Sequence, residues 1–239
     1  MSPARCNLRE VSFSHLFPLE AARALSGGLA MAVASAHSRG FVHGDIHLRN
    51  VLSPLPNAAN SRFLPTFRPP LVMRPPEARF APLSPLSYSA DIWSLAFAIW
   101  EIIGMKAIFS SEFATADDVF AQQIDVLGAS SLPPEWWDAW EQRSNFFSSS
   151  SDQKIKIPRE DRYVWPPLDE AFEEGVQKYR RQSQKVKEFD EEEMTAILEL
   201  MRRMFGFRPE DRLTADEVLQ SNWMVKWALP EFFKTLEMM

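Results

Sequence analysis

Lysine is absent from the first 105 residues of this 239-residue chain, and the first lysine is Lys106. Cysteine occurs once, as Cys6, which excludes an intramolecular disulfide framework and fits a reducing compartment. The N-terminal residues contain no apolar stretch of signal-peptide length. The most apolar segment, residues 92–109, contains Glu101 and Lys106, which argues against a membrane span. We therefore expect a soluble intracellular protein, located in the cytoplasm or the nucleus.

Acidic charge is concentrated in the middle of the chain. The net charge of the whole chain is −6, while residues 110–175 hold fourteen acidic and five basic residues. Such a segment can attract a basic peptide, and a plain solvated acidic face is an equal alternative. No basic stripe interleaved with aromatic residues is present. We therefore expect no nucleic-acid partner and, without a membrane span, no membrane partner.

Helical patterns dominate the chain and predict a mainly α architecture. Residues 89–105 are apolar on every side, which is typical of a helix buried all round. Gly27 and Gly28 weaken an earlier helix by roughly 1 kcal/mol each relative to alanine, so packing has to hold that helix. Residues 53–87, rich in proline, are predicted to form a long loop. Start and stop signals predict further helices over 18–40, from Thr115, from Pro133, over 168–187, over 190–205 and from the capping box Thr214–Glu217.

Four short motifs occur in one order along the chain. The first is His43-Gly44-Asp45-Ile46-His47-Leu48-Arg49-Asn50, in which Asp45 and Asn50 have the spacing of the protein-kinase catalytic loop, H-R-D-x-x-x-x-N. Arg74-Pro75-Pro76-Glu77 resembles the A-P-E element, Asp91-Ile92-Trp93-Ser94 the buried D-x-W-[SG] helix, and Arg208-Pro209-Glu210-Asp211-Arg212 the late R-P-x-x-R element. Together they give the chain a resemblance to the C-terminal lobe of eukaryotic protein kinases, closest in wording to fungal kinases related to the SR-protein kinases.

The resemblance implies catalytic roles for residues of the first motif. Asp45 matches the catalytic base, which orients the substrate hydroxyl and accepts its proton. Asn50 matches the residue that helps to hold a second Mg²⁺ ion through its side-chain oxygen. His47 stands where the family has a lysine that neutralises the transferred phosphoryl group. Gly44 stands where the family has an arginine that pairs with an activation-loop phosphate.

Four other residues match structural positions of the family. His43 matches a structural histidine of the loop, and Asp91 matches the carboxylate that accepts backbone hydrogen bonds from the loop. A simpler explanation of Asp91 is a negative charge at a helix N-terminus, which the macrodipole favours, and the two explanations are compatible. Glu77 and Arg212 match a buried ion pair, in which removal of one partner typically costs about 3–5 kcal/mol.

The resemblance implies ATP and Mg²⁺ as cofactors, yet several groups that bind them are missing from the sequence. No aspartate lies between Asp45 and Asp91, so the D-F-G aspartate is absent. Neither a Gly-x-Gly-x-x-Gly motif nor a lysine precedes His43, and the forty-two residues before it are too few for an N-terminal lobe. Phosphoryl transfer depends on cations placed around the developing charge. We therefore expect the activity of the chain as written to be impaired or lost.

We predict a single domain, a kinase-like C-lobe over residues 1–230, followed by a tail over 231–239. Residues 1–88 would hold the first helix, the catalytic-loop-like motif and a shortened activation segment, and residues 89–230 a helical subdomain. The resemblance implies transfer of the ATP γ-phosphoryl group to serine in Arg/Ser-rich proteins. Two alternatives stay open: a non-catalytic module that binds basic Arg/Ser-rich peptides, and an incomplete fragment of an active kinase.

Overall fold

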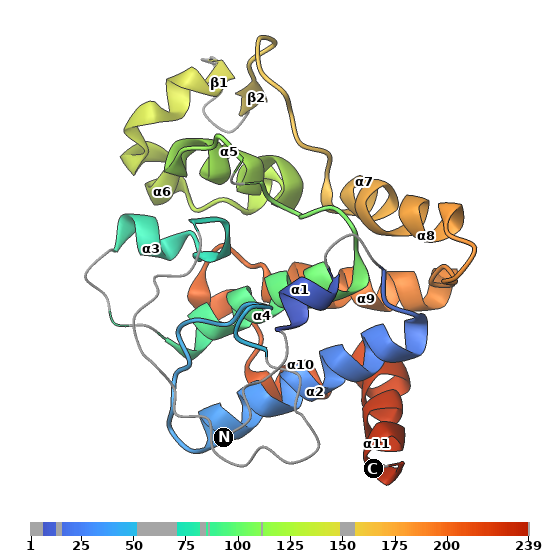
Figure 1. Ribbon diagram of the computed structural model, residues 1–239. Coiled ribbons are helices and arrows are strands. Elements are labelled where there is room, and N and C mark those ends of the chain that lie inside the picture. Colours follow the sequence, from blue (N-terminus) through green and yellow to red (C-terminus); the bar gives the residue numbers. More distant parts are fainter. Residues whose placement is uncertain are drawn as a thin grey trace.

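The computed structural model is built almost wholly of helices, which confirms the mainly α class predicted from the sequence (Figure 1). Cys6 and most of the loop predicted over 53–87 lie outside the described residues. Among the described helices, none is long and apolar enough to cross a membrane. The structure describes residues 7–12, 16–51, 71–81, 85, 87–110, 112–148 and 156–238.

Short helices surround a few long ones, and two-residue strands form a small antiparallel sheet. The α-helices are α1 (Leu8–Ser12), α2 (Leu19–Ser38), α3 (Glu77–Phe80), α4 (Tyr88–Ile103), α5 (Ala116–Leu127), α6 (Pro134–Ala139), α7 (Leu168–Phe172), α8 (Lys178–Gln182), α9 (Glu191–Met204), α10 (Ala215–Leu219) and α11 (Leu229–Glu237). The strands are β1 (Phe147–Ser148) and β2 (Ile157–Pro158). Further helical turns are π-helical over Glu173–Gln177 and Met224–Ala228, and 3₁₀ over Leu71–Met73, Ala129–Ser131, Glu141–Asn145 and Pro209–Asp211.

Helix α4 lies at the centre of the molecule, and α2 and α9 pack against it (Figure 1). It begins where the Ser87 hydroxyl oxygen accepts the N–H of Ala90, and its last turn closes with the N–H of Gly104 on the carbonyl of Trp100. Thirteen of its sixteen residues are buried. The prediction of a helix buried on every side is therefore confirmed, with its ends within two residues of those expected.

Helix α2 carries a strip without side chains, Gly27 and Gly28, against which the C-terminal part of the chain packs. A Cβ atom on Gly27 would lie 2.9 Å from the carbonyl oxygen of Ala228, and one on Gly28 would lie 2.9 Å from the Phe232 ring. Such distances are too short for carbon atoms in a packed core, so only glycine allows this crossing. Residues 231–237, which belong to the predicted tail over 231–239, instead contribute most of α11, which packs on α2.

The helix predicted over 168–187 is interrupted and ends early. It consists of α7, a π-helical segment and α8, and it stops at Gln182. The carbonyl of Gly175, within the π-helical segment, accepts two backbone N–H groups from the loop after α4. The side-chain amide of Gln177 exchanges two hydrogen bonds with the backbone of Phe189. These bonds draw the following residues back along the helix, so the helix cannot continue.

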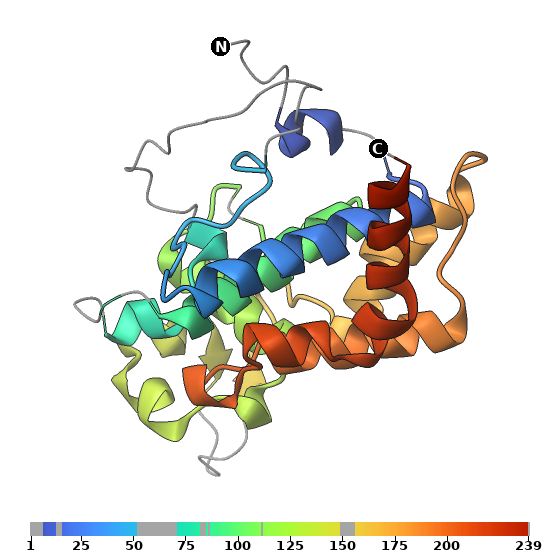
Figure 2. The same ribbon diagram turned by 90° about the horizontal axis from the view of Figure 1, so that it is seen from below.

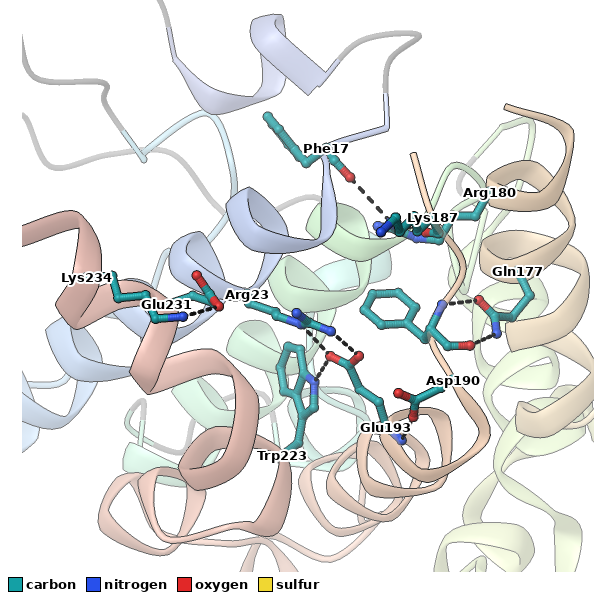
Figure 3. Close-up of polar contacts among 11 residues, drawn as sticks. Phe17, Arg23, Gln177, Arg180, Lys187, Asp190, Glu193, Trp223, Glu231 and Lys234 are labelled. Atoms are coloured by element: carbon teal, nitrogen blue, oxygen red, sulfur yellow. Dashed lines mark hydrogen bonds and ion pairs between the residues drawn. The ribbon is translucent and has the colours of Figure 1, made fainter. Parts of the chain in front are cut away.

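Two buried charges connect the helices around α4 (Figure 3). Arg180 is fully buried and donates two hydrogen bonds, of 3.1 and 2.8 Å, to the carbonyl oxygen of Ile103 at the end of α4. Burial lowers the pKa of Arg180 to about 10, so the guanidinium is still charged at neutral pH. Glu193 on α9 is also fully buried, and it accepts two bonds from Arg23, of 2.9 and 2.6 Å, and one from the Trp223 indole at 3.1 Å.

Replacing Glu193 by alanine should lower the free energy of unfolding by about 3–5 kcal/mol, because the Arg23 guanidinium and the Trp223 N–H lose their acceptor inside the protein. The matched control is Glu192→Ala, which removes an exposed carboxylate paired with exposed Lys226. The control should change the free energy by no more than about 0.5 kcal/mol. Urea denaturation followed by tryptophan fluorescence measures both, and equal losses in the two variants would contradict the role given to Glu193.

Candidate functional site

The motif over residues 43–50 is attached to the central helix by Asp91, which lies in the first turn of α4 and is buried. Asp91 accepts the N–H of His43 on Oδ2 and the N–H of Gly44 on Oδ1, both at 2.7 Å. Nε2 of His37, in the last turn of α2, lies 2.9 Å from Oδ2. The backbone contact that the kinase resemblance implies for Asp91 is therefore present, and one buried carboxylate fixes the start of the motif.

Gly44 adopts a backbone conformation that other residues avoid. Its φ angle is +72°, in the left-handed region, where a side chain with a Cβ atom costs roughly 1–2 kcal/mol. In this conformation its N–H donates to Asp91. The loop reaches Asp91 through this left-handed turn. The turn therefore explains why glycine stands at the position where the kinase pattern has arginine.

Hydrogen bonds within the motif bring Asp45 and Asn50 together. Nδ2 of Asn50 donates to Oδ2 of Asp45 at 2.7 Å and to the backbone carbonyl of Asp45 at 2.9 Å. The N–H of Asp45 donates to Nδ1 of His43 at 3.2 Å, so the histidine ring supports the loop backbone. The predicted base, the predicted ligand residue and the structural histidine therefore form one cluster.

His47 is a buried histidine whose ring contacts Asp45. Nδ1 of His47 accepts the N–H of Arg49 at 3.2 Å, which places the ring proton on Nε2, 3.3 Å from Oδ1 of Asp45. This Oδ1 is buried and has no hydrogen-bond partner among the described residues. Burial lowers the pKa of His47 below its usual value, so the ring is neutral at pH 7. A neutral ring does not supply the positive charge of the family's lysine.

The Mg²⁺ site implied by the resemblance is incomplete. The described residues contain no group of three or more histidine, cysteine, aspartate or glutamate side chains that could hold a metal ion. The amide nitrogen of Asn50 is bound to Asp45, which is the one carboxylate of the motif. Mg²⁺ requires near-octahedral oxygen ligands, usually including one or two carboxylates. Among the described residues, the motif offers Mg²⁺ one carboxylate, that of Asp45, and the side-chain oxygen of Asn50.

Glu77 in α3 and Arg212 form a two-pronged ion pair between segments 135 residues apart. Nη1 and Nη2 of Arg212 donate to the two oxygens of Glu77 at 2.8 and 2.6 Å. The buried Arg212 side chain also donates to the carbonyl oxygens of Ser89, Gly206 and Phe207. The ion pair implied by the resemblance is therefore present. It meets α4 through Ser89 and forms a second anchor, separate from the Asp45 cluster.

Two polar contacts near the motif are missing from the sequence-based predictions. His37 binds Asp91 and packs on Tyr88, with ring centroids 4.5 Å apart. Glu101 pairs with Arg9 of α1 at 2.6 Å. A signal for the second contact exists in the sequence, because Asp91 and Glu101 are the two charged residues of α4, whose other residues are mostly apolar. No comparable signal marks His37, because a histidine in a last helical turn is already explained by the helix dipole.

Arg212→Ala should lower the free energy of unfolding by about 3–5 kcal/mol, because it leaves the Glu77 carboxylate and buried carbonyl oxygens without their donor. Thermal unfolding followed by circular dichroism measures the effect as a lower melting temperature. Arg208→Ala is the matched control, since Arg208 is partly exposed and pairs with the exposed residues Glu135 and Glu210. An unchanged melting temperature for Arg212→Ala would count against the structural importance of the ion pair.

The pH dependence of stability should report on His47. The folded pKa lies below the ordinary 6.5, so the unfolded chain binds more protons between the two values and stability rises with pH. This contribution is present above the unfolded pKa and is lost as the pH falls through the folded pKa. We expect the melting temperature to drop from about pH 7.5 to about pH 5.5, and to drop less in His47→Gln. Identical drops in both chains would refute the assignment.

Comparisons with known proteins do not assign the chain to a family. No protein-family model matches the sequence. No curated protein matches it either. The kinase-like interpretation therefore rests on the motifs and on the contacts that join them.

Proposed function

We propose that the chain is a homologue of Ser/Thr protein kinases, with the fold of their C-terminal lobe, that binds basic Arg/Ser-rich peptides and is inactive as a phosphotransferase. The observation that carries the proposal is that residues of separate motifs meet in space. Asp91 holds the backbone of His43 and Gly44, and Arg212 holds Glu77. Motifs that matched by chance would have no reason to contact one another in the pairs that the resemblance names, so these contacts support it.

Asp45 is covered in a way that favours binding over catalysis. Its Oδ2 accepts the Asn50 amide, and its Oδ1 is buried against His47. A serine hydroxyl would have to share Oδ2 with the Asn50 amide, because Oδ1 is buried. The motif therefore has the residues of a catalytic loop, but contacts within the motif occupy or bury the oxygens of Asp45.

The lack of groups that would hold Mg·ATP also argues against catalysis. Phosphoryl transfer needs cations that stabilise the charge developing on the transferred group. In this chain no aspartate lies between Asp45 and Asp91, where the D-F-G aspartate would be, and burial lowers the pKa of His47 and disfavours its charged form. The family reaction, transfer of the ATP γ-phosphoryl group to serine, is therefore not expected of these residues.

Carboxylates on the surface favour a basic peptide as the partner. Some acidic residues of the segment 110–175 are already neutralised, as Asp125 is by Arg162 and Asp117 by Arg79. Exposed carboxylates attract cationic peptides, and salt weakens that attraction. The described acidic residues of this segment that are exposed and make no ion pair are Glu112, Asp138, Glu141, Glu160, Glu170 and Glu174.

Binding of a fluorescently labelled peptide of alternating arginine and serine, measured by fluorescence anisotropy, tests the proposal. We expect saturable binding that weakens as the salt concentration rises and does not change when Mg·ATP is added. A peptide of equal length with glutamate in place of arginine is the matched control and should not bind. The absence of saturable binding of the arginine peptide at low salt would overturn the proposal.

Mg·ATP separates this function from the enzymatic alternative. In the proposed function the thermal unfolding midpoint is the same with and without Mg·ATP, because a ligand raises the midpoint only if it binds the folded state. A higher midpoint with Mg·ATP, together with phosphate incorporation that Asp45→Asn abolishes, would favour the enzyme instead.

A further inference from the structure

A small cavity lies where the end of α2, the start of α4 and the start of α10 meet, and its volume is about 230 Å³. Figure 2 shows these three segments together at one side of the molecule. Cavities that bury drug-sized ligands measure about 300–1,000 Å³, so this cavity suits a molecule built on one ring. The apolar residues that line it are all buried: Ala34, Ile92, Leu213 and Ala215.

Two aromatic residues, His37 and Tyr88, also line the cavity and pack on each other. Their ring centroids lie 4.5 Å apart, and the ring planes are inclined by 48°. Tyr88 is 44% exposed, so part of its ring is open to a ligand. The face of an aromatic ring attracts both other flat rings and cations. The two rings therefore favour a flat ligand, and a positive charge on it adds to the attraction.

The charged groups of the cavity also favour a cation. Asp216 lines the cavity and is exposed, and its carboxylate has no hydrogen bond or ion pair among the described residues. Arg212 lines it as well, but each N–H of its guanidinium is already bonded, to Glu77 or to a backbone carbonyl oxygen. No donor of Arg212 is left for an anion. The charge that a ligand can use here is therefore the negative charge of Asp216.

His37 has one ring nitrogen without a partner. Its Nε2 lies 2.9 Å from Oδ2 of Asp91, and because a carboxylate accepts hydrogen bonds, the proton of the neutral ring belongs on Nε2. Nδ1 is then an acceptor, and within the described part of the chain no group donates to it. Since the carboxylate of Asp216 is an acceptor too, a ligand that uses both needs N–H donors.

We propose that this cavity binds a small flat cation with N–H donors, of the aryl amidine or aryl guanidine class. The aromatic part packs on Tyr88, and the N–H groups donate to the carboxylate of Asp216 and to Nδ1 of His37. The positive charge lies beside the one unpaired carboxylate among the described lining residues. Such binding needs neither the arginine–serine peptide nor ATP.

Occupancy of the cavity also stabilises the motif over 43–50. A donor at Nδ1 of His37 keeps the ring proton on Nε2, because the hydrogen bond at one ring nitrogen determines the state of the other. That proton faces Asp91, which accepts the N–H groups of His43 and Gly44. The ligand therefore acts on the backbone of the motif through two side chains, without contacting the motif itself.

Isothermal titration calorimetry of the full chain with three compounds of one shape tests the chemistry of the site. Benzamidine is the cation, benzamide is its neutral counterpart and benzoate is the anion. We expect saturable binding of benzamidine, binding of benzamide that is weaker by about tenfold, and no binding of benzoate. The absence of saturable binding of benzamidine at millimolar concentration, or equal affinities of benzamidine and benzamide, would overturn the proposal.

Variants of the lining residues test the location. Asp216→Asn should weaken benzamidine binding by about tenfold, because a neutral amide forms no charge-assisted bond with an amidinium. Asp211→Asn is the matched control, since Asp211 is exposed, makes no ion pair within the described chain and lies outside the cavity. Tyr88→Leu should weaken binding, whereas Tyr88→Phe keeps the ring and should leave it unchanged. Equal affinities of the two asparagine variants would place the bound benzamidine elsewhere.

Hydrogen exchange on the unaltered chain tests the effect on the motif. The amide protons of His43 and Gly44 should exchange more slowly with saturating benzamidine, because their acceptor Asp91 is held in place. The amide of Trp137, which bonds within α6, is the control and should keep its rate. Unchanged rates at His43 and Gly44, or equal slowing at all three amides, would show that the cavity does not act on the motif through His37.

Discussion

Helix α4 has no polar face, and such a helix is stable in water only when other elements enclose it. α2 and α9 pack against it, Arg180 binds the carbonyl of Ile103 at its end, and Arg212 binds the carbonyl of Ser89 in its first turn. Because α4 is fixed from several directions, the carboxylates of Asp91 and Glu101 have fixed positions as well. Polar segments that need those carboxylates must come to the helix, and the motif over 43–50 and α1 both do.

The elements that depend on local chemistry could be predicted from the sequence. The Thr115 and Thr214 hydroxyls cap their helices as expected, with Asp118 and Glu217 completing the capping boxes. The uniform apolarity of α4 also indicated its burial. What the sequence did not reveal depends on partners distant along the chain. The early end of α8 is an example, because it follows from the hydrogen bonds between Gln177 and Phe189.

In the candidate site as well, contacts between motif residues could be predicted from the sequence, whereas contacts outside the motifs could not. The contacts of Asp91 with the loop and of Arg212 with Glu77 were expected because the motif resemblance names both partners. The pairing of Arg9 with Glu101 was not, since it joins residues 92 positions apart that belong to no motif. The burial that lowers the pKa of His47 was not visible in the sequence either, because it depends on the packed structure around the ring.

At the glycine strip of α2, residues of the C-terminal part of the chain fill the space that side chains of α2 would otherwise fill. At Gly27 and Gly28 the surface of α2 is bare peptide backbone, and α11 with the preceding turn shields it from water. Without that shield, water would compete for the hydrogen bonds in the middle of α2. Helix α2 carries His37 in its last turn, and Nε2 of His37 lies within hydrogen-bond distance of Asp91. By packing on α2, helix α11 therefore supports the helix that carries His37, and His37 in turn contacts the carboxylate that holds the loop.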